Sequence, residues 1–235
     1  MAQDRILLAE TSAWNAERVL KHAGSAHIGN PVYQVATSRW VFPVSGVSEF
    51  RSEGRHVLLD GLTVLILPTG LSYQIREWHS GPRSHVVVSK KPGSPQSGAV
   101  QGELALTLAP RALWELRRHW RTVERSDAQA VMPGWVLSSV NEASRASTMD
   151  HPAVMRARRF MATRSAQTDS DAWSLHDVAD AAYCSYFHLA RLFRMQTGVS
   201  LHAYRERLRL AMALERLDGD ADDLAGLANE LGYSS

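Results

Sequence analysis

The chain contains a segment that carries two arginines and no acid. No Asp or Glu occurs between Cys184 and Arg205, and Arg191 and Arg194 lie three residues apart, a spacing that places them on one side of a helix. A guanidinium group donates several hydrogen bonds and suits both phosphates and the O6 and N7 acceptors of guanine. The segment therefore indicates contact with a polyanion.

Other side chains with reactive chemistry are few and scattered. Cys184 is the only cysteine, and the one base near it in the sequence is His188, so we expect a structural residue rather than a nucleophile. His56, His79 and His85 lie far apart and no His-x-His pair occurs, so the spacing of a metal site is absent. We predict no catalytic residue, no metal and no cofactor.

A capped helix is expected to position the arginines. Ser185 is a typical N-cap and Gly198 a typical helix stop, while Ser174 with Asp177 predicts a capping box for a preceding helix. The buried stripe of the arginine helix would be Leu189, Leu192 and Phe193. The opposite face would carry Tyr186, Phe187, Ala190, Arg191 and Arg194.

The preceding helix has a second copy near the end of the chain. An offset of 49 residues places LHDVADAAYCS, residues 175–185, on LAGLANELGYS, residues 224–234. Each copy has a small residue on its inner face, then a turn, then a serine, which is typical of a helix-turn-helix unit. The first copy continues through both helices, and the second stops at its turn.

These features resemble the DNA-binding domain of the AraC/XylS family of bacterial transcription regulators, over roughly residues 152–235. The resemblance rests on the Ala179–Ser185 turn, the LxRLFxxxTGxS run of Leu189–Ser200, the Arg209-Leu210 pair and the LAxxLGYSS sequence of the second copy. One departure is Tyr183, because the family often has glycine in this turn.

The resemblance implies two helix-turn-helix units, joined by one long helix, that contact two successive major grooves of DNA. It implies base contacts at Phe187, Ala190 and Arg191, and Arg191 suits guanine. The candidate DNA-contacting residues are Ser185, Tyr186, Phe187, Ala190, Arg191 and Arg194. A second recognition helix would follow Ser235, so we expect the chain to be a fragment.

The N-terminal half shows a different periodicity. Apolar residues alternate between about Val32 and Ser89, which predicts short antiparallel strands in a barrel or sandwich. Asp60-Gly61 predicts a two-residue hairpin turn, and residues 68–70 and 80–82 predict further turns. The strand pattern resembles the cupin-like effector domain of the same family. Aromatic residues suited to a small-molecule pocket, or to the core, are Trp40, Phe42, Tyr73 and Trp78.

The predicted fold class is α+β, in three parts. Residues 1–107 would form a cupin-like antiparallel β barrel, residues 108–150 a helical dimerisation and linker region, and residues 151–235 an all-α tandem helix-turn-helix domain with an incomplete second unit. Helices are expected at residues 110–123 and, more weakly, 128–147, with a linker at residues 141–152. The five further helices are expected at residues 152–162, 175–182, 186–196, 201–217 and 224–231.

Composition limits the class of protein. The 235 residues are 45% hydrophobic, the formal net charge is +2, and no apolar run is long enough to cross a membrane. A single cysteine without a signal-like N-terminus indicates the cytoplasm. We expect a transcription regulator that binds promoter DNA and a small-molecule effector, forms a homodimer, and contacts RNA polymerase if it is an activator. The alternative is a metal-dependent cupin enzyme fused to a helical domain, which the histidine spacing disfavours.

Overall fold

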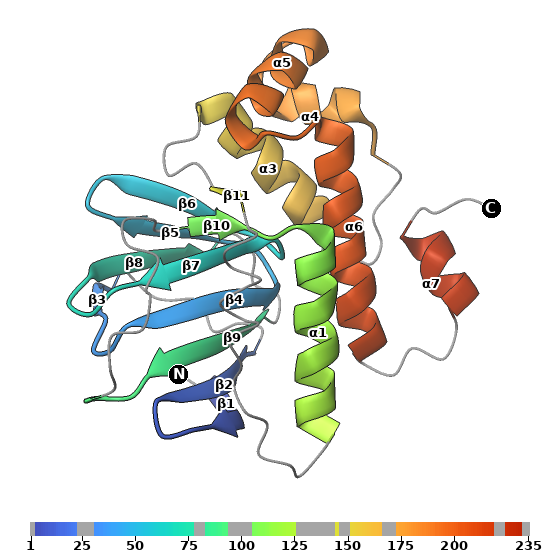
Figure 1. Cartoon of the computed structure of the whole chain (residues 1–235). Coiled ribbons are helices and arrows are strands. Elements are labelled where there is room, and N and C mark those ends of the chain that lie inside the picture. Colours follow the sequence, from blue (N-terminus) through green and yellow to red (C-terminus); the bar gives the residue numbers. More distant parts are fainter. Residues whose placement is uncertain are drawn as a thin grey trace. The chain divides into compact units, whose positions relative to one another are not determined.

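The computed structural model describes residues 3–22, 31–77, 83–93, 105–125, 144–145, 151–165, 173–218 and 224–231. The chain divides into two compact units, Met1–Thr148 and Met149–Ser235. The described strands belong to the first unit and the helices α3 to α7 to the second (Figure 1). We name them the β unit and the helical unit.

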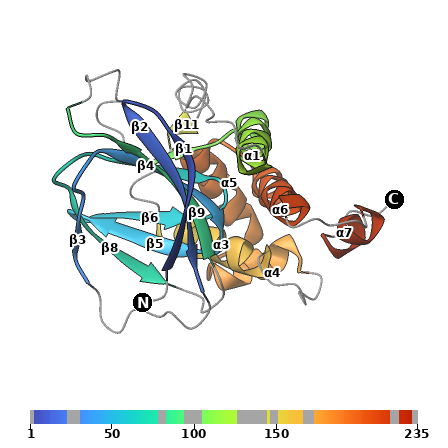
Figure 2. The same ribbon diagram turned by 90° about the horizontal axis from the view of Figure 1, so that it is seen from below.

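The β unit contains two antiparallel sheets. One has the strand order β1-β2-β9-β4-β7-β10-β11 and the other β3-β8-β5-β6. In Figure 2, seen from below, β5, β6 and β8 run side by side. The strands are β1 Gln3–Glu10, β2 Trp14–Lys21, β3 Tyr33–Gln34, β4 Arg39–Ser45, β5 Ser48–Ser52, β6 Arg55–Leu59, β7 Thr63–Leu67, β8 Ser72–Glu77, β9 Arg83–Lys90, β10 Ala105–Thr107 and β11 Ser144–Arg145.

The core of the β unit lies between the two sheets. Phe50 and Val57 are opposite each other on β5 and β6, and they pack with Leu65 and Leu67 of β7. Val41 of β4 and Tyr73 of β8 pack against the same cluster. Because both sheets contribute apolar side chains to one cluster, the strands form a sandwich, which was one of the two predicted arrangements.

Helix α1, Pro110–Arg125, packs against β4 from the other side. The rings of Trp120 and Phe42 meet edge to face with centroids 5.3 Å apart, and Arg117 donates a hydrogen bond from Nη2 to the Val44 carbonyl at 2.7 Å. Leu113 and Leu116 are buried, as their helical spacing predicts. The helix therefore covers the face of β4 that points away from the core between the sheets.

The predicted hairpin at Asp60-Gly61 is wrong. A turn exists there, but β6 pairs with β5 whereas β7 pairs with β4 and β10, so the chain passes from one sheet to the other. The Asp60 carboxylate accepts hydrogen bonds from the Leu62 amide at 3.1 Å and the Thr63 hydroxyl at 2.9 Å. This side chain closes the turn without strand pairing across it.

Hairpins occur at positions that the sequence did not single out. The turn between β5 and β6 has Glu53 at φ 48° and Gly54 at φ 77°, as a two-residue hairpin turn requires. Strands β1 and β2 form another hairpin before Val32. The turn at residues 68–70 also connects the two sheets, since β8 pairs with β3 and β5. Residues 80–82 lie outside the described part of the chain.

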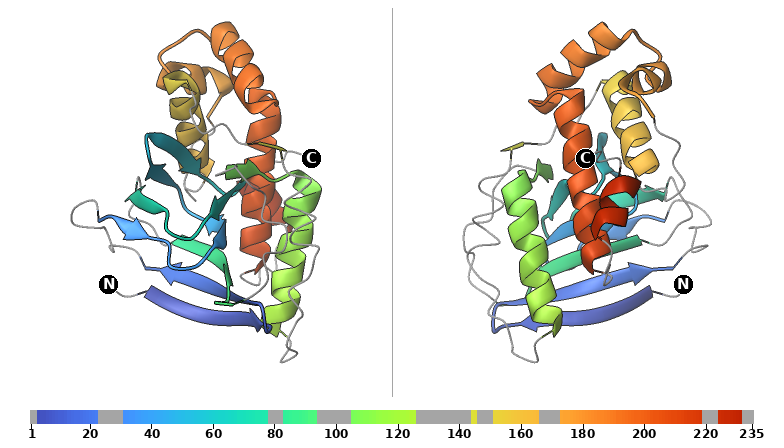
Figure 3. Two further views of the ribbon diagram at one scale, coloured as in Figure 1. Left: turned by 60° about the vertical axis from the view of Figure 1, so that its left-hand side comes forward. Right: turned by 90° about the vertical axis from the view of Figure 1, so that its right-hand side faces the viewer.

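Strand β1 forms one edge of the larger sheet (Figure 3). Its pairing with β2 is shifted by a bulge between Leu7 and Ala9. At the opposite edge, Ser144–Arg145 pair with β10, so the helix predicted over these two residues is wrong there. The extended backbone at these positions satisfies hydrogen-bonding groups of β10 that would otherwise be unpaired. The rest of residues 126–150 lies outside the described part of the chain.

The helical unit contains α3 Pro152–Ser165, α4 Leu175–Ala181, α5 Tyr186–Thr197, α6 Leu201–Asp218 and α7 Leu224–Glu230. All five helices lie where the sequence predicts them, and together with the sandwich they confirm the α+β fold class. Helices α4 and α7 have seven residues each and start 49 positions apart, as the repeat predicts. None of the described helices is both long and apolar enough to cross a membrane.

Candidate nucleic-acid interface

Helix α4 begins at the predicted capping box. The Ser174 hydroxyl accepts a hydrogen bond from the Asp177 amide at 3.3 Å, and the Ser174 amide donates to the Asp177 carboxylate at 2.6 Å. The Asp177 carboxylate also accepts a hydrogen bond from the Ser174 hydroxyl at 2.8 Å. The bonds from the backbone and the hydroxyl of Ser174 hold the pKa of the Asp177 carboxyl below its usual value. Two free amides of the first turn are thereby satisfied, which fixes where α4 starts.

Helix α5 follows after a short turn and has the predicted caps. The Ser185 hydroxyl accepts from the His188 amide at 3.4 Å, and Gly198 ends the helix with φ 75°, donating its amide to the Arg194 carbonyl at 3.0 Å. Leu189 and Phe193 are fully buried, whereas Leu192 is only half-buried. Because this apolar stripe is buried, one side of α5 faces the core of the helical unit and the other side faces solvent.

The six predicted DNA-contacting residues lie on α5 and at its N-cap. Ser185, Phe187, Arg191 and Arg194 are exposed, and Tyr186 and Ala190 are half-buried. Phe187 is 83% exposed, although large aromatic side chains are usually mostly buried. The structure therefore brings a serine hydroxyl, an apolar ring and two guanidinium groups onto one helix.

Charge on this helix is not neutralised by any residue that the structure describes. In the described part of the chain, neither Arg191 nor Arg194 takes part in an ion pair, in contrast to Arg209 of α6, whose Nη1 is 3.0 Å from Glu206 Oε1. Both guanidinium groups are consequently free to bind an external anion. Arg191 is one turn after Phe187 and Arg194 lies toward the C-terminal end.

A residue that the sequence did not indicate extends this surface. The ring of His176, in the first turn of α4, stacks on Tyr186 with centroids 5.2 Å apart and planes at 21°. Tyr186 in turn meets Phe187 edge to face at 5.7 Å. The three rings join the first turns of α4 and α5 and restrict the orientation of Phe187. The signal was only a His in the second position of α4, which has no distinctive spacing.

The turn between α4 and α5 is held from α3. Tyr183 has φ 57°, a left-handed conformation that favours glycine, so the backbone is strained at this position. Arg156 of α3 donates to the Ala182 carbonyl from Nη2 at 2.8 Å, and its guanidinium lies 5.1 Å from the centre of the Tyr183 ring. The arginine therefore stabilises both the turn and its aromatic side chain, which is 83% exposed.

A second arginine of α3 supports the connecting helix. Arg158 is buried, and its Nε donates to the Tyr204 hydroxyl of α6 at 3.0 Å. The Tyr204 ring packs edge to face on Phe193 of α5, with centroids 5.2 Å apart. Through these contacts α3, α5 and α6 share one core, which keeps α5 in a fixed orientation within the helical unit.

The four aromatic residues predicted for a ligand pocket do not share one face. Trp40 packs on Trp14 at 4.6 Å and Phe42 packs on Trp120, whereas their neighbour Val41 faces the cluster that contains Tyr73. Since side chains alternate along a strand, Trp40 and Phe42 lie on the opposite face of β4 from Tyr73. Trp78 lies outside the described part of the chain.

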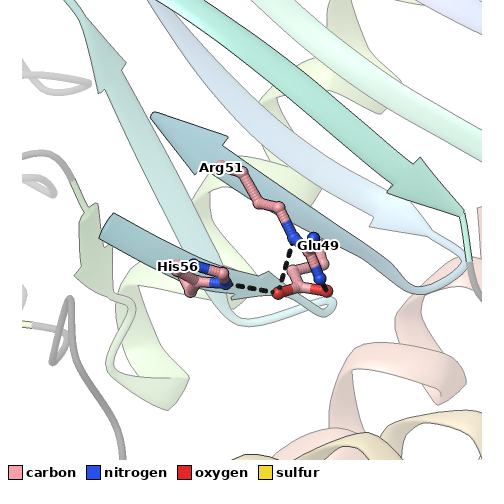
Figure 4. A network of polar contacts seen from close by, with 3 residues as sticks. All are labelled: Glu49, Arg51 and His56. Atoms are coloured by element: carbon pink, nitrogen blue, oxygen red, sulfur yellow. Dashed lines mark hydrogen bonds and ion pairs between the residues drawn. The ribbon is translucent and has the colours of Figure 1, made fainter. Parts of the chain in front are cut away.

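The β unit also has a polar network on β5 and β6 (Figure 4). Glu49 accepts hydrogen bonds from Arg51 Nε at 3.0 Å and Nη2 at 2.9 Å, and it is 2.8 Å from His56 Nδ1. Burial opposes ionisation of Glu49, but the hydrogen bonds from Arg51 and His56 outweigh it, so the pKa of this carboxyl lies below its usual value. Among the described residues, no three His, Cys, Asp or Glu side chains are grouped to hold a metal ion.

Comparison with known proteins finds a family model that matches within the helical unit and one curated relative that matches part of the chain. Residues 178–235 match the family described as a helix-turn-helix domain. Regulatory protein PocR of Salmonella typhimurium is 29% identical over 97 residues, which make up 41% of this chain and 31% of that protein. The chain thus matches about a third of the length of this curated relative.

The solved structures that match part of this chain have low sequence identity. AerE from Microcystis aeruginosa is 12% identical, with a TM-score of 0.38 over 46% of this chain and 48% of that chain. A cupin domain from Bordetella pertussis Tohama I is 12% identical, with a TM-score of 0.30 over 38% of this chain and 93% of that chain.

Proposed function

We propose, from the membership of the helical unit in the AraC/XylS family of helix-turn-helix domains, that this chain is a sequence-specific DNA-binding transcription regulator. In this proposal α5 enters the major groove of DNA. Arg191 contacts a guanine, Phe187 and Ala190 make apolar contacts with base edges, and Arg194 binds a phosphate. Ser185 and Tyr186 contact the backbone of the duplex at the start of the helix.

The observation that carries this proposal is the pair of exposed guanidinium groups on α5. They lie on a helix without acids, beside an exposed aromatic ring, and have no ion-pair partner among the described residues. Water alone would solvate such a face, but the duplex offers one negative charge about every 1.7 Å along its axis. The core of α3, α5 and α6 holds the face in place before DNA arrives, so little ordering is required on binding.

We assign the β unit to the sensing of a small-molecule effector rather than to catalysis. A ligand that binds one arrangement of the protein better than another would shift the population toward it and change how the helical unit is presented to DNA. The same proposal includes a homodimer, with residues 108–150 as dimerisation and linker region, a cytoplasmic location, and contact with RNA polymerase if the protein activates transcription. Of the predicted pocket residues, Tyr73 fits this role best, because its ring is half-buried between the sheets.

The test is a binding titration at several salt concentrations with a duplex selected from a random pool by the whole chain. Arg191→Ala should cost about 1–3 kcal/mol of binding free energy and relax the preference at one base pair. Arg194→Ala should weaken binding to all sequences alike and reduce the slope of log affinity against log salt by about one.

Arg55→Ala provides the matched control, because Arg55 is an exposed arginine on β6. It should bind the selected duplex as the unmodified chain does. If Arg191→Ala keeps the same base preference, Arg191 does not contact a base. If neither α5 variant changes affinity or salt slope, α5 is not the interface.

A further inference from the structure

One arginine of the β unit is buried with hydrogen-bond donors left over. Arg83 starts β9, and its side chain is only 9% exposed. Its Nη2 lies 2.7 Å from Glu77 Oε1 at the end of β8, an ion pair that joins the two sheets. Within the described part of the chain, its Nε and Nη1 are buried and have no hydrogen-bond acceptor. A buried guanidinium normally has all its donors paired, because an unpaired one has lost its water without compensation.

The backbone beside Arg83 is adapted to it. Gly46, between β4 and β5, has φ 83°, and a Cβ atom built there would lie 2.2 Å from Arg83 Cγ. No other residue type would leave room for the arginine stem in this position. Arg83 is therefore held by Gly46 on one side and by Glu77 on another, in spite of its unpaired donors.

Among the described residues around Arg83, positive charge exceeds negative charge. Lys21, the last residue of β2, pairs with Arg83 across the sheet, and its Nζ lies 3.7 Å from the same Glu77 oxygen. Two cations thus share one carboxylate, and both side chains are largely buried. Arg5, also near this group, has its own carboxylate in Glu17 at 2.8 Å.

Neighbouring groups respond to this excess. Burial and then the charges of Lys21, Arg5 and Arg83 lower the pKa of His85 to about 3, so His85 is neutral at physiological pH and adds no charge. Burial also lowers the pKa of Lys21, although Glu77 partly opposes this. The group Lys21, Glu77 and Arg83 is therefore short of one negative charge and of acceptors for two donors.

We propose that Lys21 and Arg83 bind the oxyanion, a carboxylate or a phosphate, of a small molecule at this end of the sandwich. The oxyanion would accept a hydrogen bond from one of the two unpaired Arg83 donors, Nε or Nη1, which lie on different edges of the guanidinium group, and Lys21 would contribute its charge. All three residues lie at strand ends, so they sit at a rim of the β unit rather than in mid-strand. Burial, and then the charges of Tyr73 and Glu77, raise the pKa of Tyr33, which pairs with Tyr73 across β3 and β8.

This inference rests on the proposed sensing role of the β unit and assigns the effector to the class of small organic anions. Stacked rings lead from β3 into the core, Tyr33 on Tyr73 at 5.4 Å and Tyr73 on Phe50 at 5.2 Å. Tyr73, Ile75 and Glu77 alternate along one face of β8, and the first two pack against the core. The body of the ligand would therefore meet aromatic and apolar side chains, and its charged end would meet Arg83.

The experiment titrates the whole chain, without DNA, with sodium acetate and separately with sodium phosphate at constant ionic strength. Acetamide serves as the neutral analogue of acetate. The readouts are the thermal unfolding midpoint and the NMR signal of the Arg83 Nε–H group. We expect acetate or phosphate to raise the midpoint in a saturable way and to shift the Arg83 signal over the same concentrations, whereas acetamide does neither. The two anion arms distinguish a carboxylate from a phosphate site.

Variants make the result specific. Arg83→Met and Lys21→Met should each weaken the anion response at least tenfold, whereas Arg55→Met, which removes an exposed arginine, should retain it. If Arg83→Met does not fold, the response of Lys21→Met and the Arg83 signal of the unmodified chain still show whether the anion binds at this site. No saturable response, or the same response in all variants, overturns the anion site. Because DNA is absent from this experiment, a negative result does not contradict the proposed DNA binding through Arg191. Likewise, failure of the DNA-binding test does not contradict an anion site that is observed here.

Discussion

On α5, Arg191 and Arg194 lie exposed to solvent on a helix without acids, whereas in the β unit Arg83 and Lys21 lie largely buried around the single carboxylate of Glu77. In the part of the chain that the structure describes, both arrangements have more positive than negative charge. They differ in how much water remains around the charge, and that difference decides which kind of anion each can bind.

Exposed guanidinium groups stay hydrated in the free protein. Each contact that they make with a polyanion therefore contributes little binding free energy, and that contribution depends strongly on salt. Buried cations have already lost most of their water when the protein folds, so one correctly placed oxyanion gains strong hydrogen bonds and is less affected by salt. Affinity for DNA should therefore fall steeply as salt rises, while acetate or phosphate binding should change little. The following variants test the parts of this contrast, from the largest expected effect to the smallest.

Phe193→Ala should have the largest effect on stability, because the exposed arginines depend on the core beneath them. Phe193 is fully buried against Tyr204, and its loss would leave a cavity costing about 3–5 kcal/mol of the free energy of unfolding. Urea denaturation of the helical unit measures this. Met195→Ala on the same helix is the control, since Met195 is 72% exposed and should change stability by less than about 0.5 kcal/mol. Similar losses in both variants would contradict the burial of Phe193.

Gly46→Ala tests the buried side of the contrast. The new methyl group would collide with the Arg83 stem in a left-handed backbone conformation, which should cost about 1–3 kcal/mol of stability of the β unit. Displacement of Arg83 should also weaken the anion response. Gly54→Ala is a matched control, because Gly54 has φ 77° but nothing within 4 Å of its Cβ position. If Gly54→Ala weakens the anion response equally, contact with Arg83 is not the cause.

Substitutions of Tyr183 test the turn that joins α5 to α4. Tyr183→Ala keeps the left-handed conformation but loses the ring over Arg156, and it should cost about 0.5–1 kcal/mol. Tyr183→Gly loses the same ring but relieves the backbone strain, so its stability should equal or exceed that of the unmodified chain. Thermal denaturation compares the two. Equal destabilisation by both would show that the strain at Tyr183 is negligible.

The smallest expected effect concerns pH and the network of Glu49. Because the folded-state pKa of Glu49 is lowered, its contribution to stability is present above the unfolded pKa and is lost as pH falls through the folded value. Glu49→Gln should therefore make the β unit less sensitive to pH below about 5, the range in which a carboxyl group titrates. Denaturation midpoints between pH 7 and pH 3 measure this, and an unchanged pH profile would contradict a role for the Glu49 carboxylate.

The sequence predicted the helical unit well because its signals are local. Ser174, Asp177, Ser185 and Gly198 each specify a helix end through contacts within a few residues, so the positions of α4 and α5 and the exposed face of α5 could be derived before the structure. His176 and Arg156 were missed, because their contacts with Tyr186 and Tyr183 depend on how helices pack.

The β unit was predicted less well because strand pairing is not local. Asp60-Gly61 has the composition of a hairpin turn, yet each flanking strand pairs with a partner distant in the sequence. Alternation in β4 also could not show that Trp40 and Phe42 face away from Tyr73, since that depends on which face each sheet turns inward. The group around Arg83 was invisible for the same reason: Lys21, Glu77 and Arg83 meet only after three strands have assembled.

The edges of the two sheets bear on how the protein behaves at high concentration. An exposed strand edge can recruit a strand from another molecule and start aggregation. Here β1 carries Asp4, Arg5 and Glu10 and is interrupted by its bulge, β6 carries Arg55 and His56, and β3 and β11 have two residues each. Charged, bent or very short edges are poor templates for intermolecular pairing, so the β unit should remain free of cross-β assembly despite the exposed Ile6 and Leu7 on its outermost strand.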